Sequence, residues 1–248
     1  MNLISVKNLS KRFGENVVLN KVSFCIKKGE FISIIGSYGS GKTTLIKLIC
    51  GLYKTYSGEI QINNKNPQKT VLNREIGYCP QKPSLLPWRT VMENLSLPQE
   101  IAGYMDLNFL KKLLDSVGMG KYEHYDINKL SGGMQQLIAI VRCLVLDPVL
   151  LVLDEPFSSL DEITREKMQK LLLSLVSHSN KTTILITHSI DEAIYLSDRI
   201  FVLDKNKKTI NNIFDVKLKH RTENVRFSKE FLQLKKTLRK ELTYGKQI

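Results

Sequence analysis

The segment Phe31-Ile-Ser-Ile-Ile-Gly-Ser-Tyr-Gly-Ser-Gly-Lys-Thr-Thr44 decides the fold of this chain. Its first five residues form a short apolar run, which is typical of a buried parallel strand. The nine residues that follow match the phosphate-loop pattern G-x-x-x-x-G-K-[ST], and residues 45–50 continue with the apolar spacing of a helix. Because this pattern requires the order strand, loop and helix, it predicts a phosphate-binding α/β fold and disfavours a glycine-rich turn with a surface lysine.

Each part of the loop has a predicted role toward a nucleoside triphosphate. The glycines at 36, 39 and 41 let backbone N–H groups converge on phosphate oxygens, at the positive end of the helix that follows. Lys42 supplies a cation for the β- and γ-phosphates, and Thr43 offers a hydroxyl to Mg²⁺. The predicted ATP-binding residues of the loop are Gly36, Ser37, Tyr38, Gly39, Ser40, Gly41, Lys42, Thr43 and Thr44.

A second apolar segment, residues 148–153, ends at the acid pair Asp154 and Glu155. At the C-terminal end of a parallel strand, such a pair lies at the ligand edge of the sheet. Asp154 is therefore predicted to hold Mg²⁺, and Glu155 to act as general base toward the attacking water. The alternative is a helix N-cap followed by a first-turn acid. The phosphate loop upstream favours the catalytic interpretation.

Between these two segments lies Leu-Ser-Gly-Gly-Met-Gln-Gln, residues 130–136. In this order with the loop and the acid pair, it resembles the signature motif of the ATP-binding subunits of ATP-binding cassette (ABC) transporters. The resemblance implies that Ser131, Gly132 and Gly133 contact the γ-phosphate held by the opposite subunit of a homodimer. The physical basis is a helix N-terminus, opened by small residues and pointing at an anion.

The resemblance covers residues 3–205 and implies roles for four further side chains. Gln81 matches the glutamine that joins the Mg²⁺ and water shell, and His188 matches the switch histidine that contacts the γ-phosphate. Asp161, in Ser-Ser-Leu-Asp, matches the D-loop across the dimer interface, and Phe13 sits where an aromatic ring stacks on adenine. Alone, His188 is more often a strand-end histidine with an ordinary hydrogen bond, Phe13 is more often a core residue, and Gln81 indicates almost nothing. Their joint order and spacing carry the interpretation.

The sequence departs from the usual family text at a few positions. Ser37 and Tyr38 stand in the loop where Pro and Ser are usual, and Leu137 follows the signature where a basic residue is usual. Phe13 replaces the commoner Tyr, although stacking needs only a ring. Ser189 follows the histidine where Asp is common. None of these changes removes a catalytic group, so an active ATPase is expected.

Composition favours a chain in the cytoplasm without a membrane span of its own. It has 248 residues, of which 42% are hydrophobic, and no apolar run reaches the roughly 18 residues of a membrane span. The N-terminus lacks the layout of a signal peptide. Its four cysteines are isolated, as in a reducing compartment, and three of them are expected to be small core residues. These three are Cys25, Cys50 and Cys143; the fourth is Cys79.

The net charge of +13 is uneven, because residues 217–248 contain 10 Lys and Arg but only 3 Asp and Glu. Three interpretations of this basic tail stay open: a solvated helix face, attraction to anionic lipid, or contact with nucleic acid. Because the tail lacks interleaved aromatics and a recognised binding fold, no nucleic-acid partner is expected.

The resemblance implies a P-loop NTPase cassette: an α/β fold with a mostly parallel core sheet, an antiparallel β-subdomain and an inserted helical lobe. The predicted domains are an ATP-binding core at 1–82 and 133–216, a helical lobe at 83–132 and a basic helical tail at 217–248. The predicted strands are residues 3–8, 17–26, 31–35, 58–62, 149–153, 182–187 and 199–203, and the predicted helices include 90–97, 106–117, 162–177, 190–197 and 228–242.

The segment Pro-Ser-Leu-Leu-Pro-Trp-Arg-Thr-Val-Met-Glu-Asn-Leu, residues 83–95, is similar to ATPases of the nitrate/sulfonate/taurine importer group. The resemblance implies an importer ATPase at the cytoplasmic face of the cell membrane, with an integral-membrane permease and an extracytoplasmic substrate-binding protein as partners. Proline-rigid and aromatic, the segment is suited to contact a partner helix, and the alternative is a buried hinge that contains Trp88. Importers of thiamine-precursor type look similar. Exporter ATPases and soluble ABC ATPases are the other classes considered.

Overall fold

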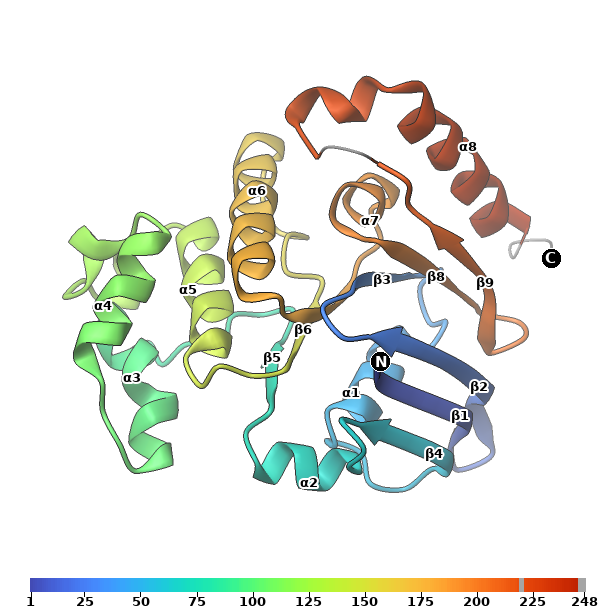
Figure 1. Cartoon of the computed structure of the whole chain (residues 1–248), viewed down its shortest axis with the longest axis horizontal. Helices are drawn as coiled ribbons and strands as arrows, with labels where there is room; N and C mark the ends of the chain where they lie inside the picture. The colour runs from blue at the N-terminus through green and yellow to red at the C-terminus, as the bar shows by residue number, and fades with distance from the viewer. Residues whose placement is uncertain (219–220, 245–248) are drawn as a thin grey trace. The chain divides into compact units, whose positions relative to one another are not determined.

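The computed structural model describes residues 1–218 and 221–244, so residues 219–220 and 245–248 of the predicted basic tail lie outside the described residues. The chain forms two compact units (Figure 1). The first unit combines Met1–Asn73 with the segment from Asn180 onward, and the second is Arg74–Ser179.

The first unit contains a three-stranded antiparallel sheet in the order β2-β1-β4. Leu3, Ile4, Val6 and Leu9 of β1 are buried, and Ile4 pairs with Ile26 on one side and with Ile62 on the other. This is the predicted antiparallel subsheet, with longer strands than expected. Its strands are β1 (Asn2–Phe13), β2 (Asn16–Lys27) and β4 (Ser57–Ile62), and the short helix α2 (Pro67–Leu72) follows β4.

The first unit also carries parallel strands around β3. Strand β3 (Phe31–Ile35) lies between β7 (Thr182–Ile186) and β8 (Arg199–Asp204) and is parallel to both, while β9 (Thr209–Asp215) is antiparallel to β8. Every residue of β3 and β7 is buried, which explains their nearly continuous apolar sequences. The phosphate loop follows β3, so it lies at the carboxyl edge of these strands, where ligands bind.

Three helices complete the first unit: α1 (Lys42–Ile49), α7 (Ile190–Leu196) and α8 (Lys229–Tyr244). Helix α7 packs on β3, and α8 packs on α7 and β8 (Figure 1). Phe231 and Leu238 form the buried stripe of α8, and Lys235 forms an ion pair of 2.8 Å with Asp191 of α7. The predicted final helix is thereby confirmed.

The second unit is built on the parallel pair β5 (Ile76–Cys79) and β6 (Leu150–Asp154), in which Tyr78 pairs with Val152. Gly77 is required here, because a Cβ at this position would lie 2.4 Å from the carbonyl oxygen of Cys143. The helices of this unit are α3 (Val91–Ala102), α4 (Leu107–Ser116), α5 (Gly132–Leu144) and α6 (Glu162–Ser179).

One α-helix and two strands were not expected from the sequence: α2, β5 and β9. Strand β9 reads Thr-Ile-Asn-Asn-Ile-Phe-Asp and has no fully buried residue, so it lacks the buried apolar run of its neighbours. The expectation that Cys25 and Cys143 are core residues is wrong, since both are only half-buried; Cys50 is buried as expected. Over the described residues, no helix combines the length and the apolar character needed to cross a bilayer.

Candidate nucleotide site

The phosphate loop has the backbone that its glycines permit. Gly39 and Gly41 have φ angles of 75° and 100°, in the left-handed region that favours glycine, and Gly41 is the N-cap of α1. A Cβ on Gly36 would lie 2.5 Å from the carbonyl oxygen of Leu203, so the loop begins in close contact with β8. The N-terminus of α1 has no side-chain cap, which leaves its N–H groups directed at the loop.

Lys42 is almost fully buried and turns back on its own loop. Its Nζ donates to the carbonyl oxygens of Gly36 at 2.8 Å and Ser37 at 3.1 Å. The hydroxyl of Ser40 is buried without a hydrogen-bond partner among the described residues. A buried hydroxyl without a partner is costly, so this atom fits a ligand that supplies an acceptor.

The other loop side chains divide by exposure. Thr43 is exposed on the first turn of α1, so its hydroxyl is accessible to a metal ion. Tyr38 is 89% exposed, and its side chain is not needed to form the loop. Ser37 and Thr44 are half-buried. The buried lysine, the orphaned hydroxyl and the accessible threonine together fit a triphosphate with Mg²⁺.

His188 follows β7 on the same sheet edge as the phosphate loop, because β7 pairs with β3 up to Ile34 and Ile186. Its neighbours are fixed by hydrogen bonds. The Thr187 hydroxyl donates to the buried carboxylate of Glu192 and accepts from the Ser189 N–H at 3.0 Å. The backbone that carries His188 is therefore held rigidly, while the histidine side chain is exposed. Sequence reasoning missed Thr187 and Glu192.

Phe13 is 44% exposed at the end of β1, which excludes the alternative of a core phenylalanine. Its ring packs edge to face with Tyr53, with centroids 5.5 Å apart. The Nζ of Lys11 lies over the Phe13 ring, 4.7 Å from its centroid. Phe13, Tyr53 and Lys11 are hereafter called the aromatic shelf; sequence reasoning identified only Phe13.

In the second unit, the acid pair lies at the end of β6, beside the segment that follows β5. Gln81 donates from Nε2 to Oε2 of Glu155 at 3.2 Å, and Tyr78 donates from Oη to Oδ2 of Asp154 at 3.4 Å. Asp154 is 5% exposed, whereas Glu155 is half-buried. Glu155 has a φ angle of 49°, which is uncommon for a residue with a side chain and occurs often at functional sites. The predicted residues Gln81, Asp154 and Glu155 are thus brought together.

The segment after Glu155 turns sharply into α6. Ser158 donates from its backbone N–H and from its hydroxyl to the carbonyl oxygen of Glu155, at 3.3 and 3.0 Å. Asp161 accepts from the Thr164 N–H at 3.0 Å, as an N-cap does. This hydrogen bond lowers the pKa of Asp161 below its ordinary value.

The signature residues begin α5. Ser131 is the N-cap, and its hydroxyl accepts from the Met134 N–H at 3.3 Å. Ser131 and Gly132 are exposed, and Gly132 has open space where a Cβ would be. Gly133 is buried, and a Cβ there would lie 2.8 Å from the side chain of Thr164. An exposed, side-chain-free helix start is suited to approach an anion.

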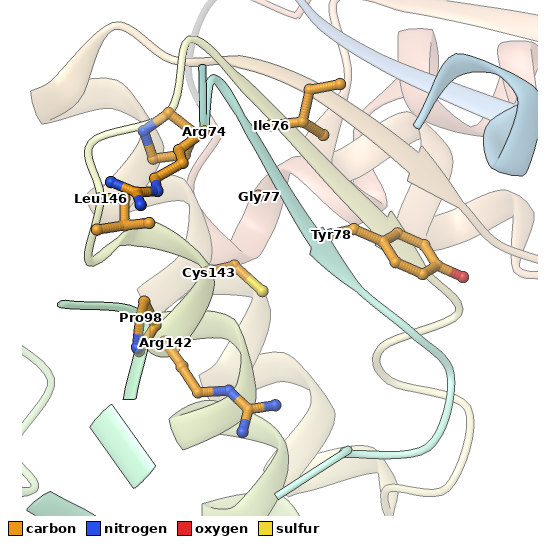
Figure 2. A pocket seen from close by; sticks show the side chains of 9 residues that line it. Arg74, Ile76, Gly77, Tyr78, Pro98, Arg142, Cys143 and Leu146 are labelled. Atoms are coloured by element: carbon orange, nitrogen blue, oxygen red, sulfur yellow. The ribbon is translucent and has the colours of Figure 1, made fainter. Parts of the chain in front are cut away.

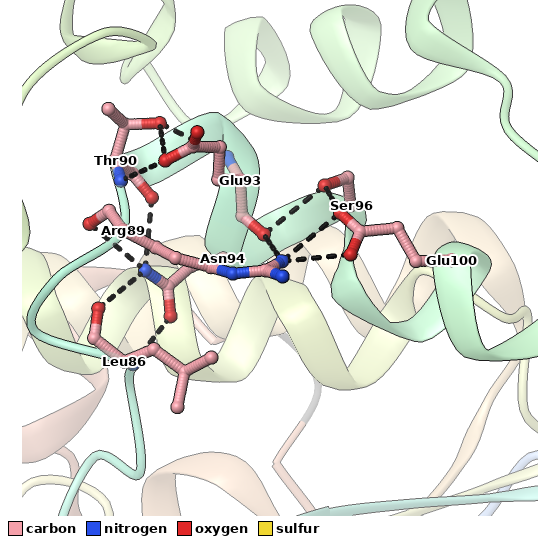
Figure 3. Close-up of polar contacts among 7 residues, drawn as sticks. All are labelled: Leu86, Arg89, Thr90, Glu93, Asn94, Ser96 and Glu100. Atoms are coloured by element: carbon pink, nitrogen blue, oxygen red, sulfur yellow. Dashed lines mark hydrogen bonds and ion pairs between the residues drawn. The ribbon is translucent and has the colours of Figure 1, made fainter.

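The segment that contains Trp88 is held by a polar network at the start of α3 (Figure 3). Asn94 is fully buried; it donates to the carbonyl oxygens of Leu86 and Thr90 at 3.0 Å and accepts from the Leu86 N–H at 2.7 Å. Thr90 and Glu93 form a capping box. Trp88 itself is 76% exposed, so the alternative of a buried hinge is wrong.

A pocket of about 200 Å³ lies beside β5 and between α3 and α5 (Figure 2). Arg74 and Arg142 line it, but they bond to different carbonyl groups: Arg74 to Ile101 and Ala102, and Arg142 to Ser84. Cys143 also lines the pocket, while the Cys79 thiol is buried. A hydrogen bond with the Cys143 thiol, together with burial, raises the pKa of Cys79 well above its ordinary value.

The family model described as ABC transporter matches residues 19–158 of this sequence, which span the phosphate loop, the signature and the acid pair. The chain belongs to the ABC transporter family. Membership confirms the predicted family, and the prediction of an ATP-hydrolysing enzyme is confirmed with it.

Two relatives with similar sequences have import functions in their names. The chain is 36% identical over 240 residues to an aliphatic sulfonates import ATP-binding protein SsuB of Bacillus cereus, covering 96% of this ABC chain and 94% of that protein. It is 39% identical over 211 residues to the taurine import ATP-binding protein TauB of a Jannaschia species, covering 82% and 78% of the two chains. The predicted similarity to the sulfonate and taurine group is confirmed.

Solved structures share the fold. The dimeric structure of a post-hydrolysis state of the ATP-binding cassette MJ0796 bound to ADP and Pi has a TM-score of 0.76 and 31% identity, covering 87% of this chain and 99% of that one. The structure of cbiO1 from Clostridium perfringens, part of the ABC transporter complex cbiONQ, has a TM-score of 0.79 and 25% identity, covering 98% and 97%. The predicted α/β cassette fold is confirmed.

Proposed function

We propose that the chain is the ATP-hydrolysing subunit of an ABC importer and that it drives uptake of a small anionic solute through a separate permease. The observation that carries the ATPase part is the Gln81–Glu155 hydrogen bond at the end of β6, next to the buried carboxylate of Asp154. A pair of acids with an amide donor at a strand end is suited to hold a metal ion and to activate water.

We further propose that the phosphate loop binds the ATP phosphates. The N–H groups from Gly36 to Thr44 and the Ser40 hydroxyl would donate to phosphate oxygens, and the Lys42 ammonium would leave its loop carbonyls for the β- and γ-phosphates. Phe13 would stack on the adenine ring. The exposed Thr43 in the first turn of α1 and the orphaned hydroxyl of Ser40 support this assignment.

Hydrolysis is assigned to three side chains. Glu155 would accept the proton of the attacking water, Gln81 would orient that water, and His188 would donate to the γ-phosphate. Thr43, Asp154 and Gln81 would hold Mg²⁺, which neutralises phosphate charge when bound. The left-handed backbone of Glu155 and the fixed backbone around His188 support preorganised roles for both residues.

Two copies of the chain are proposed to act together, with Ser131, Gly132 and Gly133 of one copy facing the γ-phosphate held by the other. The exposed start of α5 supports this role. Asp161 is proposed at the same interface, although its carboxylate already caps α6. In functional terms, residues 1–82 and 133–216 would form the ATP-binding core, 83–132 the helical lobe and 217–248 the basic tail.

The proposed partners are an integral-membrane permease and an extracytoplasmic substrate-binding protein, which would hold the chain at the cytoplasmic face of the membrane. The names of the sulfonate and taurine relatives support a sulfonate or taurine as the solute, and nitrate is a further candidate from the predicted importer group. A thiamine-precursor-like solute is the alternative. Because the permease and the binding protein contact the solute, they select it.

The test is reconstitution of the chain in proteoliposomes with the proposed permease and substrate-binding protein. ATP hydrolysis is measured with taurine, an alkanesulfonate, nitrate and a pyrimidine thiamine precursor in turn. We expect stimulation by a sulfonate or another small anion. Stimulation by the thiamine precursor alone would overturn the solute assignment, and no ATP hydrolysis under any condition would overturn the enzyme assignment.

A further inference from the structure

Lys11 is a buried cation that has no carboxylate partner among the described residues. Its side chain extends from β1, and the residue is 7% exposed. Nζ donates to the carbonyl oxygen of Thr55, and among the described residues it forms no ion pair. Removing an ammonium group from water is costly unless other groups replace the lost hydration. The burial of Lys11 therefore indicates a role other than keeping the protein surface soluble.

Two aromatic rings complete the environment of this ammonium. Nζ lies 4.7 Å from the centroid of the Phe13 ring and 5.6 Å from that of Tyr53. A cation over a ring face is attracted by the negative face of the ring, and the attraction grows when both are removed from water. Lys11 thus covers one face of Phe13, whereas Phe13 remains 44% exposed.

The aromatic shelf is also connected to the phosphate loop through α1. Tyr53 donates from its backbone N–H to the carbonyl oxygen of Lys47 at 3.3 Å, and the Lys47 ammonium lies 5.8 Å from the Tyr53 ring. Lys47 is in the last turn of α1, the helix that begins at Lys42. The Phe13 ring and the loop are therefore held by one continuous set of contacts.

We propose that Lys11 is the positioning residue for the nucleotide base: it fixes Phe13 and leaves one ring face for adenine. This inference rests on the proposed function, because it assumes that Phe13 stacks on the base. The charge of Lys11 also draws electron density in the ring toward its own side, so the free face repels an electron-rich purine less. Lys11 would then act on the base alone and not on the phosphates.

The experiment compares a ligand that has a base with one that has none. Full-length chains carrying Lys11→Met, Lys11→Gln or Lys11→Arg are titrated with MgATP and with magnesium tripolyphosphate in a calorimeter. We expect Lys11→Met to weaken ATP binding about fivefold and to leave tripolyphosphate binding within about twofold of the parent. Lys11→Arg keeps the cation and should restore ATP affinity.

Two further variants separate charge from folding. Lys11→Gln keeps a donor for the Thr55 carbonyl but removes the charge, so it should fold even where Lys11→Met does not, and it should show the same selective loss. Lys7→Met is the matched control on the same strand, because the Lys7 side chain is 67% exposed and pairs with Glu59 at the surface at 3.9 Å. It should leave both affinities unchanged.

Phe13→Ala distinguishes failure of the inference from failure of the proposed function. If Phe13→Ala leaves ATP affinity unchanged, base stacking is wrong and the inference is overturned with it. If Phe13→Ala weakens ATP binding but the Lys11 variants do not, only the inference is overturned. If Lys11→Gln weakens the binding of ATP and of tripolyphosphate equally, Lys11 has only a structural role and the inference is overturned. In a Phe13→Ala background, Lys11→Gln should have no further effect on ATP.

Discussion

The side-chain amide of Gln81 donates to the carboxylate of Glu155 over 3.2 Å, with Gln81 following β5 and Glu155 following β6. The two residues are 74 positions apart in the sequence, yet the parallel pairing of β5 with β6 brings their strand ends to one edge. An amide N–H that donates to one carboxylate oxygen fixes the orientation of the carboxylate. The hydrogen bond therefore orients the proposed general base.

Glu155→Gln should retain ATP binding and reduce the hydrolysis rate by about 10²- to 10⁴-fold, because an amide cannot accept the proton of the attacking water. With ATP, the variant should accumulate as a closed dimer in size-exclusion chromatography. Glu162→Gln, an exposed acid in the first turn of α6, is the control and should hydrolyse normally. Parental turnover by a purely monomeric Glu155→Gln chain would exclude the base assignment.

Lys42→Ala should weaken ATP binding by roughly 2–4 kcal/mol, because the lost ammonium faces phosphate charge directly. Calorimetric titration of the full chain measures the effect. Lys69→Ala removes an exposed lysine from α2 and should leave the affinity unchanged. Equal ATP affinity in Lys42→Ala and the parent would count against the phosphate loop.

Ser131→Arg should spare ATP binding and abolish turnover, because the bulky side chain would enter the space proposed for the γ-phosphate of the other copy. Binding is measured by calorimetry and turnover by phosphate release. Ser116→Arg, at the end of α4, adds the same side chain away from the signature and should be active. Normal hydrolysis by Ser131→Arg would refute a site shared between two copies.

Trp88→Ala should weaken co-purification with the permease without changing ATP affinity or the melting temperature of the isolated chain. The side chain is 76% exposed on a segment fixed by Asn94, so it loses little packing, while a buried interface anchor commonly contributes about 2 kcal/mol or more. Phe109→Ala, a less exposed aromatic on α4, is the control. A Trp88→Ala chain that still co-purifies fully would exclude the docking role.

Thr90→Ala should destabilise the start of α3 by about 1 kcal/mol, the usual cost of a lost N-cap. The hydrogen bonds from Thr90 lower the pKa of Glu93. Because the pKa of Glu93 is lower in the folded state, its ionised carboxylate stabilises the fold at pH values above the unfolded-state pKa of about 4.3. This stability is lost as the pH falls through the folded-state pKa. Calorimetric melting should therefore show a larger effect of Thr90→Ala at pH 7 than near pH 4. If Thr90→Ala lowers the melting temperature equally at both pH values, the ionised Glu93 carboxylate does not contribute to the stability of the cap.

The sequence predicts the elements whose signal is local. The phosphate loop, the acid pair and the amphipathic helix α8 each carry a pattern within one short segment, so their structure could be predicted. Strand β9 could not, because Asn211 and Asn212 interrupt its apolar residues, and it is stabilised by pairing with β8.

The residues of the candidate site could be predicted from sequence motifs, whereas most of the contacts between them could not. Glu155 and Gln81 could be named from motifs, but their hydrogen bond depends on how two distant strands pair. Lys11 gave no signal at all, because a lysine at a strand position usually indicates a solvent-facing side chain. Its burial follows from contacts with Phe13 and Tyr53 that no short window of sequence contains.

The Lys42 ammonium donates hydrogen bonds to the carbonyl oxygens of Gly36 and Ser37 in its own loop. A phosphate ligand that binds the ammonium would compete with these carbonyl oxygens for its N–H donors. A triphosphate would offset the weakened carbonyl bonds by accepting further hydrogen bonds from the N–H groups of the loop. Under the proposed function, Lys42 would thus link the shape of the loop to the presence of a phosphate ligand.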